Sequence, residues 1–578
     1  MKNNENKLDI LRHSTAHILA AAVLDMFPEA KFGIGPAVEN GFYYDFELPR
    51  TLIPEDLPLL EEKMKSIIKE NQAFEKSEIS VEEAMNKFKE LGQTLKQELI
   101  DDLHKQGNQT VTVYKSGKFV DLCSGPHIES SGKIDARAFA LTKISGAYWK
   151  GDAEKQQLQR IYGVVFENKD QLKEYKNQQE EAAKRDHKKL GRELDLFSFH
   201  SEAPGSAFWH PKGMIIWNEL EKFGKSLRKK FNYQEIQTPI LAKNTLWKTS
   251  GHWDHYKDDM FSFNMDQETY CLKPMDCPFN IKIYQTQQRS YKDLPIRYTE
   301  IGRILRNEKS GELNGLLRVR HLTQDDSHIF LMRSQVKEEI AALIKMTKEY
   351  YKTFGINPEF FLSTRPENYI GELNDWDEAE KDLKLALENE NVKFEIKEKD
   401  GAFYGPKIDI DIKDALGRRW QLATIQLDFQ LPGRFEIDYI SNEGKKDTPV
   451  MIHAAIFGSF ERFIGIITEH FAGAFPLWLS PVQVAVLPVS EKFADWAKEV
   501  ENKLAENEIR VELNDKAESL GKRISESEKQ KIPYIIVIGE RETNDKTVTV
   551  RTRAIKEQQA LPIDEFIEKI SSEIKSKA

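Results

Sequence analysis

The chain has 578 residues, 40% of them hydrophobic and 31% charged, which indicates a globular protein of about three or four domains. Its formal net charge of -10 argues against a general nucleic-acid coat protein but leaves room for a local basic patch. Its three cysteines have no paired spacing, so we expect no disulfide framework and a reducing, cytoplasmic compartment.

The first section, residues 1–170, is predicted to combine an N-terminal helix with short strands such as GFYYDF and VTVY. Its polar start, MKNNENKLD, predicts no signal peptide. In LRHSTAHILAAAV, His13 and His17 are four residues apart and therefore share one face of the helix. In DLCSGPH, Asp121, Cys123 and His127 follow a strand and enter a tight turn.

Two interpretations of these side chains stay open on spacing alone. Imidazole and thiolate groups are good zinc ligands, so His13, His17, Cys123 and His127 fit a four-ligand zinc site. The same groups can instead orient a water molecule and transfer protons during hydrolysis.

Residues 171–195 are predicted to form a linker helix that is polar and ends strongly basic. Its cations are Lys184, Arg185, Lys188 and Lys189. A solvated charged face is the simpler interpretation, and contact with nucleic-acid phosphates is the alternative.

The largest section, residues 196–480, contains many half-polar alternating runs, including RYTEIGRIL and KIDIDIK, which favour a wide antiparallel sheet. Its most apolar stretch, FIGIITEHFAGAFPLWLS, includes Glu469 and His470 and is a poor candidate for a membrane span. The last section, residues 481–578, alternates strands such as YIIVIG with helices and predicts a small α/β domain.

Arginines in the middle section suggest binding of a polyphosphate. Arg306 and Arg318 lie at the ends of a glycine-containing loop between two predicted strands, where planar guanidinium groups can clamp phosphates. Glu308 in that loop can accept hydrogen bonds from a nucleotide. Arg462 lies in an apolar helix, where a buried guanidinium requires an anion. Taken alone, the loop also fits an ordinary charged surface hairpin.

In chain order, the helix that leads to Pro239, the arginine-bearing loop and the Arg462 helix resemble motifs 1, 2 and 3 of the class II aminoacyl-tRNA synthetases. Cys277 in CLKPMDCPFN, His328 in TQDDSHIF and His453 in PVMIHAAIFGS are similar to the three zinc ligands of the threonyl-specific family. TSGHWDHYKDDMF, LSTRPE and GAFYGPKIDI resemble the same family. The resemblance runs from His13 almost to the C-terminus.

This resemblance implies an α+β multidomain fold. It implies an N-terminal α+β editing domain (1–170), a linker helix (171–195), a class II catalytic domain with an antiparallel sheet (196–480), and a C-terminal α/β anticodon-binding domain (481–578). The implied reaction is activation of threonine with ATP and transfer to tRNA(Thr), with hydrolysis of mischarged seryl-tRNA(Thr). The implied partners are one zinc ion per subunit, magnesium with ATP, and a second copy of the chain in a homodimer.

The resemblance also implies roles for individual residues. The implied ATP-binding residues are Arg306, Glu308, Arg318, Gln421 and Arg462, and the implied threonine-binding residues are Gln324, Asp326, Tyr404 and Gln426. The implied catalytic residues are Arg306, Arg462, His252 and Lys407, and the implied metal ligands are Cys277, His328 and His453. The implied editing residues, which act without metal, are His13, His17, Tyr44, Lys96, Asp121, Cys123 and His127. The implied anticodon contacts are Glu542 and Arg551.

The chain departs from the family pattern at several positions. Leu322 replaces the aromatic residue that stacks on adenine, and Ala517 replaces an asparagine at an anticodon contact. Asp276 and Asn280 stand where an asparagine and a histidine are usual around Cys277. The resemblance begins with the editing domain, so we expect no counterpart of the ubiquitin-like N-terminal domain of many bacterial members.

Two alternative functions compete with the synthetase interpretation. A non-catalytic RNA-binding or regulatory paralogue would be expected to lose Arg306, Arg462 or a zinc ligand, yet all are present. A prolyl or seryl class II synthetase does not account for Cys277, His328 and His453 together with the editing section.

Overall fold

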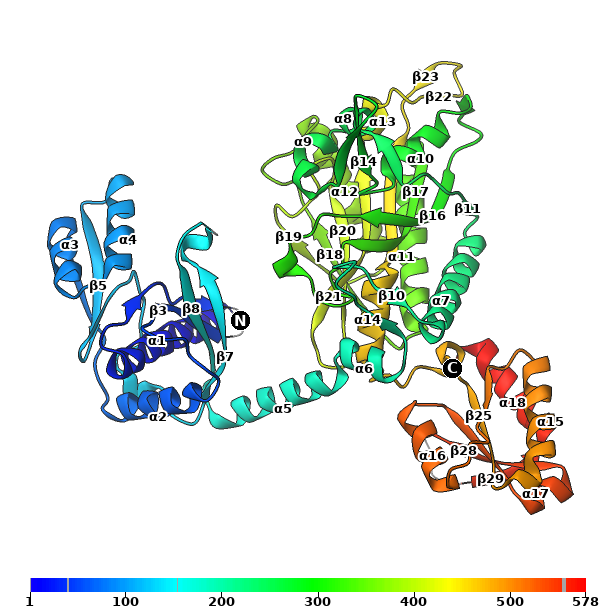
Figure 1. Cartoon of the computed structure of the whole chain (residues 1–578). Helices are drawn as coiled ribbons and strands as arrows, with labels where there is room; N and C mark the ends of the chain where they lie inside the picture. The colour runs from blue at the N-terminus through cyan, green and yellow to red at the C-terminus, as the bar shows by residue number, and fades with distance from the viewer. Residues whose placement is uncertain (1, 39–40, 153, 554–557, 578) are drawn as a thin grey trace. The chain divides into compact units, whose positions relative to one another are not determined.

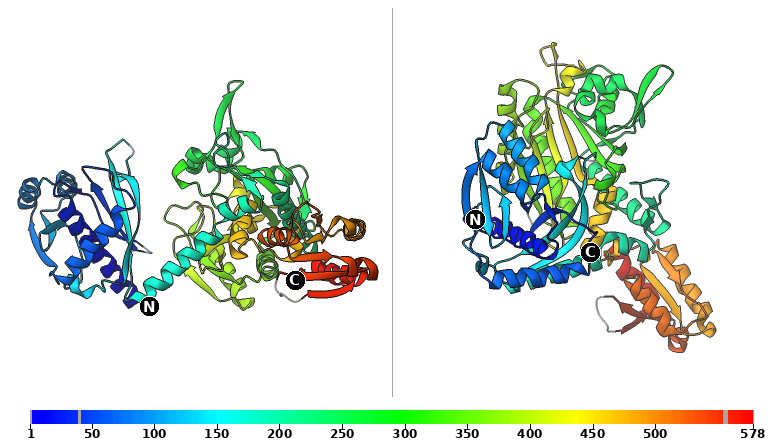
Figure 2. Two further views of the ribbon diagram at one scale, coloured as in Figure 1. Left: turned by 60° about the horizontal axis from the view of Figure 1, so that its bottom comes forward. Right: turned by 60° about the vertical axis from the view of Figure 1, so that its left-hand side comes forward.

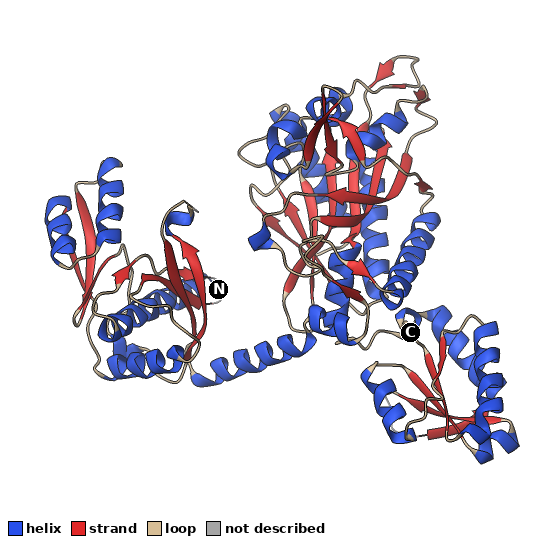
Figure 3. Cartoon of the chain, viewed as in Figure 1, coloured by secondary structure: helices blue, strands red, loops and turns tan. Residues whose placement is uncertain are grey.

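The computed structural model describes residues 2–38, 41–152, 154–553 and 558–577. The chain separates into two compact units, Met1–Glu180 and Glu181–Ala578, which are described one at a time. Helices and strands occur in both units (Figure 3). The finer domain boundaries at residues 170, 195 and 480 remain predictions.

The first unit is built on a sheet in the order β1-β3-β8-β7, with β2 paired to β3, and all its pairs are antiparallel. The strands are β1 (Lys31–Phe32), β2 (Ala37–Val38), β3 (Gly41–Glu47), β7 (Phe139–Tyr148) and β8 (Gln157–Val165). Helices α1 (Lys2–Met26) and α2 (Asp56–Lys69) pack against its apolar face (Figures 1 and 2). The alternation in GFYYDF explains this face, because Phe42, Tyr44 and Phe46 all point into the core.

A second antiparallel sheet in this unit carries part of the predicted editing residues. It joins β4 (Glu75–Ser80), β5 (Thr110–Ser116) and β6 (Phe119–Leu122), with α3 (Val81–Glu90) and α4 (Thr94–Lys105) beside it (Figure 1). Asp121 lies near the end of β6, and Lys96 lies in the first turn of α4.

The predicted single linker helix is interrupted. It consists of α5 (Lys169–Arg185) and α6 (His187–Glu193), with Asp186 between them. The Asp186 carboxylate accepts the backbone N–H groups of Lys188 at 2.7 Å and Lys189 at 3.3 Å, so it caps a new helix instead of continuing the old one.

The second unit is organised by an eight-stranded sheet in the order β11-β16-β17-β24-β21-β20-β18-β19. Its strands are β11 (Gln234–Glu235), β16 (Ile296–Leu305), β17 (His321–Leu331), β18 (Pro358–Ser363), β19 (Phe394–Lys397), β20 (Lys407–Lys413), β21 (Arg419–Asp428) and β24 (Val450–Ser459). Only the outermost pairs, β11 with β16 and β18 with β19, are parallel. The predicted wide antiparallel sheet is confirmed.

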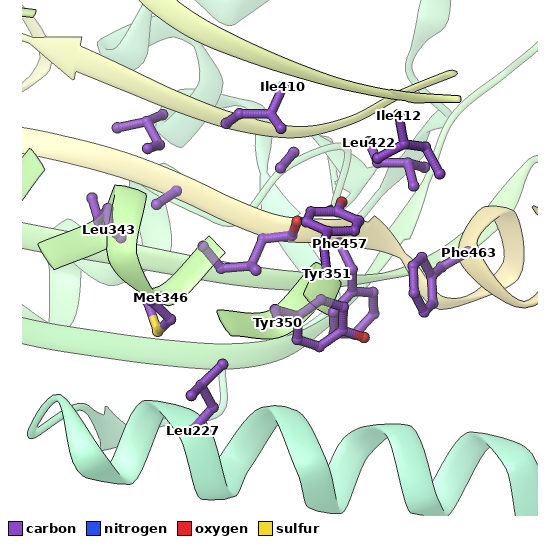
Figure 4. Packing of buried hydrophobic residues seen from close by; sticks show 14 of the residues in the cluster. Leu227, Leu343, Met346, Tyr350, Tyr351, Ile410, Ile412, Leu422, Phe457 and Phe463 are labelled. Atoms are coloured by element: carbon purple, nitrogen blue, oxygen red, sulfur yellow. Dashed lines mark hydrogen bonds between the residues drawn. The ribbon is translucent and has the colours of Figure 1, made fainter. Parts of the chain in front are cut away.

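Alternation along these strands separates the core from the polar face. Ile329 and Leu331 of β17, with Ile452 of β24, belong to the main hydrophobic core, whereas His328 and His453 alternate with them. The core face is covered by α7 (Pro211–Lys230), α11 (Val336–Lys352), α12 (Leu373–Asn389) and α14 (Phe460–His470). Figure 4 shows side chains from these helices and strands meeting, among them Tyr350 and Phe457, whose rings stack 5.2 Å apart.

Smaller elements complete the second unit. They include α8 (Asn244–Ser250), α9 (His252–Tyr256), α10 (Cys277–Tyr284) and α13 (Leu431–Arg434). Two three-stranded sheets join β12 (Leu241–Lys243), β14 (Glu268–Leu272) and β13 (Ser262–Met265), and β15 (Arg289–Ser290), β22 (Tyr439–Ile440) and β23 (Lys446–Asp447). A two-stranded sheet pairs β9 (Phe197–Ser198) with β10 (Phe208–Trp209).

The apolar stretch from Phe463 to Ser480 is not one helix. Helix α14 ends at His470, and a short 3-10 turn follows at Leu477–Leu479. Glu469 is buried near the end of α14 and bonds to His187. Across the part of the chain that is described, no helix is both long enough and apolar enough to cross a membrane.

The C-terminal residues of the second unit form the predicted small α/β arrangement. Strands β26 (Val511–Leu513), β25 (Val484–Pro488) and β27 (Tyr534–Ile538) are parallel, and β28 (Thr547–Thr552) and β29 (Gln558–Pro562) continue the sheet antiparallel. The helices are α15 (Ala494–Glu506), α16 (Leu520–Lys529), α17 (Glu540–Asp545) and α18 (Ile563–Ser576). The predicted small α/β domain is therefore confirmed, and its sheet is mixed.

Candidate functional sites

Three residues that are far apart in the sequence meet on the polar face of the large sheet. His328 of β17 and His453 of β24 are directly paired across the two strands, and Cys277 begins helix α10. One ligand atom from each, a sulfur or a ring nitrogen, lies within 4.8 Å of the others, and all three residues are buried. Strand register therefore builds a cluster that spacing along the sequence does not reveal.

The unpaired ring nitrogens of this cluster are suited to coordinate a metal ion. Among the described residues, His328 Nε2 and His453 Nδ1 are buried nitrogens without a hydrogen-bond partner. The other ring nitrogen of His453, Nε2, lies 2.9 Å from the Asp428 carboxylate, which orients the ring. Burial, followed by the nearby Asp326 charge, raises the pKa of the Cys277 thiol well above its usual range, so a cation is needed to stabilise the thiolate. One thiolate and two imidazoles suit zinc and leave a coordination position open.

Predicted threonine-binding residues surround the cluster. The Asp326 Oδ2 atom lies 3.8 Å from His328 Nε2, and the Tyr404 ring centroid lies 5.3 Å from that of His453. The Tyr404 hydroxyl donates to Gln426 Oε1, and Gln426 is paired with His453 across the sheet. Gln324 lies on β17, one strand alternation before Asp326 and hence on the same face.

A buried group of charges lies beside this pocket, and the sequence patterns did not predict it. Lys273 Nζ lies 2.5 Å from Asp276 Oδ1 and 3.1 Å from Glu300 Oε1, and all three side chains are buried. Burial, aided by the Glu300 charge and opposed by Lys273, raises the pKa of Asp276 to about 6. Gly302 leaves the room for this carboxylate, because a Cβ atom there would lie 2.0 Å from Asp276 Oδ2.

The predicted phosphate-binding arginines lie around a cavity of about 300 Å³. Arg306, Glu308 and Arg318 line it together with Tyr256, Met260 and Pro274, among others. Arg318 Nε donates to Glu308 Oε2 at 2.8 Å, and Arg306 Nε donates to the carbonyl of Pro274 at 3.3 Å.

Arg462 joins this group from the first turn of α14. Its Nε donates to the Leu317 carbonyl at 3.0 Å, within the segment that carries Arg318. Burial lowers the pKa of Arg462, and the positive charges of Arg318 and Arg306 lower it further. Arg318 pairs with Glu308 and Glu312, whereas the partly buried Arg462 has no carboxylate partner among the ion pairs of the described residues. Binding of an anion by this group of guanidinium groups stays a prediction.

The other predicted active-site residues lie in varied surroundings. Gln421 on β21 is exposed and donates to Asp409 Oδ1 at 2.6 Å, so the structure does not group it with the arginine-lined cavity. Lys407 Nζ lies 2.9 Å from Asp409 Oδ2. His252, which begins α9, is buried with its Nδ1 2.8 Å from Ser250 Oγ. Burial, with a smaller contribution from neighbouring groups that include Arg434 and Arg306, lowers the pKa of His252 to about 3, so its ring is neutral at pH 7.

The predicted editing residues of the first unit line a separate cavity of about 420 Å³. His13, His17, Lys96, Asp121 and Cys123 contribute to its wall. Cys123 Sγ lies 3.3 Å from both His13 Nε2 and His127 Nε2. The ligand atoms of His13, His17, Cys123 and His127 lie within 4.8 Å of one another, so their geometry is also compatible with a metal.

A buried ion pair supports this cavity. Lys96 forms a salt bridge with Asp121 Oδ1, and the Tyr44 hydroxyl donates to Asp121 Oδ2 at 2.6 Å. The Lys96 ammonium also donates to the Tyr44 hydroxyl at 3.2 Å, and His17 Nε2 lies 3.4 Å from Asp121 Oδ2. The structure therefore groups Lys96 with the other predicted residues.

The two predicted anticodon residues have structural partners in the C-terminal part. The Glu542 carboxylate accepts the backbone N–H of Gly539 at 2.9 Å and the Thr549 hydroxyl at 2.7 Å, which caps α17. Arg551 on β28 lies 3.7 Å from Glu528 in a partly exposed pair. Capping accounts for Glu542 without any nucleic acid.

Models of three protein families match this chain. Residues 261–471 match the tRNA synthetase class II core domain (G, H, P, S and T), residues 483–573 an anticodon binding domain, and residues 111–162 the threonyl and alanyl tRNA synthetase second additional domain. These ranges contain the cluster of Cys277, His328 and His453, the C-terminal mixed sheet and part of the cavity of the first unit.

Known proteins resemble this chain along its whole length. A threonine–tRNA ligase of Caldanaerobacter subterraneus is 49% identical over 575 residues, covering 100% of this chain and 89% of the relative, and one of Clostridium botulinum is 49% identical over 567 residues, covering 98% and 89%. A crystal structure described as the RNA binding domain of threonyl-tRNA synthetase from Cryptosporidium parvum aligns with a TM-score of 0.65 at 43% identity, covering 67% of this chain and 98% of that one. A putative threonyl-tRNA synthetase from Aeropyrum pernix aligns with a TM-score of 0.61 at 27% identity, covering 68% and 97%. The chain therefore belongs to the threonine–tRNA ligase family of class II aminoacyl-tRNA synthetases.

Proposed function

We propose that this chain activates threonine with ATP, transfers it to tRNA(Thr) and hydrolyses mischarged seryl-tRNA(Thr). The observation that carries the proposal is the buried triad of Cys277, His328 and His453, with two ring nitrogens unpaired, in a pocket beside Asp326. Full-length similarity to threonine–tRNA ligases supports the choice of amino acid. A non-catalytic paralogue has no need for these unmet ligands.

Cys277, His328 and His453 would hold zinc, one ion per subunit, and the bound ion would supply a Lewis-acidic position for the amino and hydroxyl groups of threonine. Asp326 offers a carboxylate to the threonine ammonium, while Gln324, Tyr404 and Gln426 complete the polar wall of the pocket. Valine lacks the hydroxyl and leaves polar groups unpaired, which allows discrimination of roughly 10⁴–10⁵.

In the first step, a threonine carboxylate oxygen attacks the α-phosphorus of ATP, forming the adenylate and releasing pyrophosphate. Magnesium accompanies ATP. We assign Arg306, Arg318 and Arg462 to the phosphate charge and Glu308 to the nucleotide, and their grouping around one cavity supports this assignment. We assign Gln421 and Lys407 to the nucleotide and the adenylate, respectively. This step requires positioned positive charge more than acid–base chemistry.

In the second step, a terminal ribose hydroxyl of the tRNA attacks the activated carbonyl, and AMP leaves. A neutral imidazole can accept a proton, and the lowered pKa of His252 keeps its ring neutral. We therefore assign His252 a role in this transfer, with its Nδ1 held by Ser250.

The threonine site alone discriminates weakly against serine, so we propose that the cavity of the first unit removes serine after transfer. Serine keeps the hydroxyl and lacks only a methyl group, which is worth only about 1–3 kcal/mol of selectivity. We propose that His13, His17, Cys123 and His127 position the attacking water without a metal, and that Tyr44, Lys96 and Asp121 hold the seryl ester. The mutual contacts of Cys123 with two histidines support this choice, because these donors are already paired.

We further propose that the chain acts as a cytoplasmic homodimer that contacts the anticodon through its C-terminal part. The reducing compartment is supported by three free cysteines. Arg551 is the better candidate for an anticodon contact, since the Glu542 carboxylate already caps α17.

The test is amino-acid-dependent exchange of pyrophosphate with ATP, comparing threonine, serine and valine. We expect strong exchange with threonine, weaker exchange with serine, and almost none with valine. The matched control is Arg462→Ala, which removes a guanidinium from the phosphate site and should abolish exchange. A purified, folded chain without threonine-dependent exchange would contradict the proposal and favour the non-catalytic paralogue.

A further inference from the structure

A buried histidine of the linker lies behind the phosphate-binding loop and has no part in the mechanism above. His187 begins α6 and is 1% exposed. Its Nδ1 lies 2.6 Å from Glu469 Oε1 near the end of α14, and its Nε2 accepts the backbone N–H of Leu316 at 3.0 Å. One ring therefore joins the linker, the ATP loop and the helix that carries Arg462.

The hydrogen-bond partners determine the tautomer of this ring. A backbone N–H can only donate, so Nε2 must present its lone pair to Leu316. The proton of a neutral ring is then on Nδ1, which donates to the Glu469 carboxylate. Glu469 Oε2 pairs with Arg418, so the carboxylate is itself held in place. The ring is thus a fixed acceptor for one backbone amide of the loop.

That amide belongs to the segment that connects the phosphate-binding arginines. Leu316 is followed by Leu317, whose carbonyl accepts Arg462 Nε at 3.0 Å, and then by Arg318. Lys188, the next residue of α6, donates to Asn314 Oδ1 at 3.3 Å, two residues before Leu316. The side chains of two neighbouring linker residues, His187 and Lys188, therefore form hydrogen bonds with Leu316 and Asn314.

The packing leaves room for this contact. Gly315 has a φ of +50°, and a Cβ atom there would lie 2.2 Å from His187 Nε2. On α14, a Cβ atom at Gly465 would lie 3.2 Å from Leu316 Cβ and 3.3 Å from Leu317 Cδ2. Both approaches depend on glycine, so the loop, α6 and α14 fit tightly at this point.

We propose that His187 is a positioning residue for ATP, acting through the amide of Leu316 on the placement of Arg318 and Arg462. This inference rests on the proposed function and extends it to a linker residue that does not touch the substrate. Misplacing reacting groups by about 1 Å can cost 10²-fold in rate, so a lost backbone contact at this point has a measurable effect on ATP use.

Two variants separate the two ring contacts. The asparagine amide is attached where Nδ1 is attached, so His187→Asn can keep the bond to Glu469 while losing the acceptor for Leu316. The glutamine amide extends as far as Nε2, so His187→Gln keeps that acceptor while losing the bond to Glu469. Arg192→Asn, on the exposed side of the same helix, is the matched control.

The experiment measures threonine-dependent ATP–pyrophosphate exchange with ATP and threonine varied separately, alongside the thermal unfolding midpoint and zinc content. We expect His187→Asn to raise the KM for ATP about 10-fold and lower kcat about 10- to 100-fold, with the KM for threonine and the zinc content unchanged. His187→Gln should stay within about threefold of the wild type, and Arg192→Asn should match it.

Wild-type ATP kinetics in His187→Asn, or equal losses in the asparagine and glutamine variants, would overturn the positioning role. If His187→Asn does not fold, Gly315→Ala displaces the same contact from the loop side and should show the same ATP-specific loss; an unchanged KM for ATP there counts against the role. A wild-type chain without exchange contradicts the proposed function itself, so the two failures are distinguishable.

Discussion

Buried polar atoms meet their hydrogen-bonding needs differently at the two cysteine–histidine clusters. In the second unit, His328 Nε2 and His453 Nδ1 have no partner among the described residues. In the first unit, Cys123 Sγ contacts ring nitrogens of both His13 and His127 at 3.3 Å. Unpaired buried donors and acceptors are costly, so the cluster in the second unit favours a bound ligand, whereas Cys123 in the first unit already has two partners.

One prediction at this scale concerns the metal content. Replacing the thiolate in Cys277→Ser removes the softest ligand, so we expect bound zinc to fall from one per chain to well below half by elemental analysis. Cys271→Ser is the control, because Cys271 is equally buried but lies outside the cluster. Zinc retained at one per chain in Cys277→Ser would show that the triad is not the metal site.

At the scale of elements, the register of the central strands decides which residues meet. His328 faces His453 because β17 and β24 pair with that offset, and Gln426 of β21 completes the row. A shift of one residue would turn each of these side chains into the hydrophobic core. The core itself, visible in Figure 4, therefore holds the site in register.

The contact between β16 and α10 gives a second prediction. Gly302→Ala places a methyl group against the buried Asp276 carboxylate, one residue before the ligand Cys277. We expect a loss of about 1–3 kcal/mol in the free energy of unfolding, measured with denaturant, and a higher KM for threonine. The double variant Gly302→Ala/Asp276→Ala removes the clash and should recover stability; no recovery would mean that the strain lies elsewhere.

At the scale of the whole molecule, synthesis and proofreading are assigned to different compact units. The arginine-lined cavity and the cluster of Cys277, His328 and His453 lie in residues 181–578, and the cavity proposed for editing lies in residues 1–180. The described lining of each of these two cavities comes from its own unit.

This separation predicts opposite losses in two variants. His13→Ala should reduce hydrolysis of seryl-tRNA(Thr) at least 10-fold and leave threonine-dependent exchange and one zinc per chain intact. Cys277→Ser should abolish exchange while leaving hydrolysis of supplied seryl-tRNA(Thr) unchanged. Two zinc ions per chain in the wild type, with one lost in His13→Ala, would contradict metal-free editing.

Much of the fold was predictable from local patterns. The helices at His13 and Arg462, the alternating strands of the middle section and the terminal α/β rhythm were all expected and are all present. The linker was predicted as one helix, and the Asp186 cap that divides it was missed, although aspartate is a common helix start. His187 looked like part of a polar stretch, yet it is buried.

The amino-acid sequence by itself determined the class of fold, the arginine motifs and the pair of histidines in HSTAH, because these depend on local periodicity and short spacing. Family resemblance supplied the zinc ligands, which spacing alone does not reveal. Only the tertiary structure placed His328 opposite His453, buried Lys273 against Asp276, and brought His187 to the amide of Leu316. Those contacts depend on strand register and helix packing, which join residues up to hundreds of positions apart.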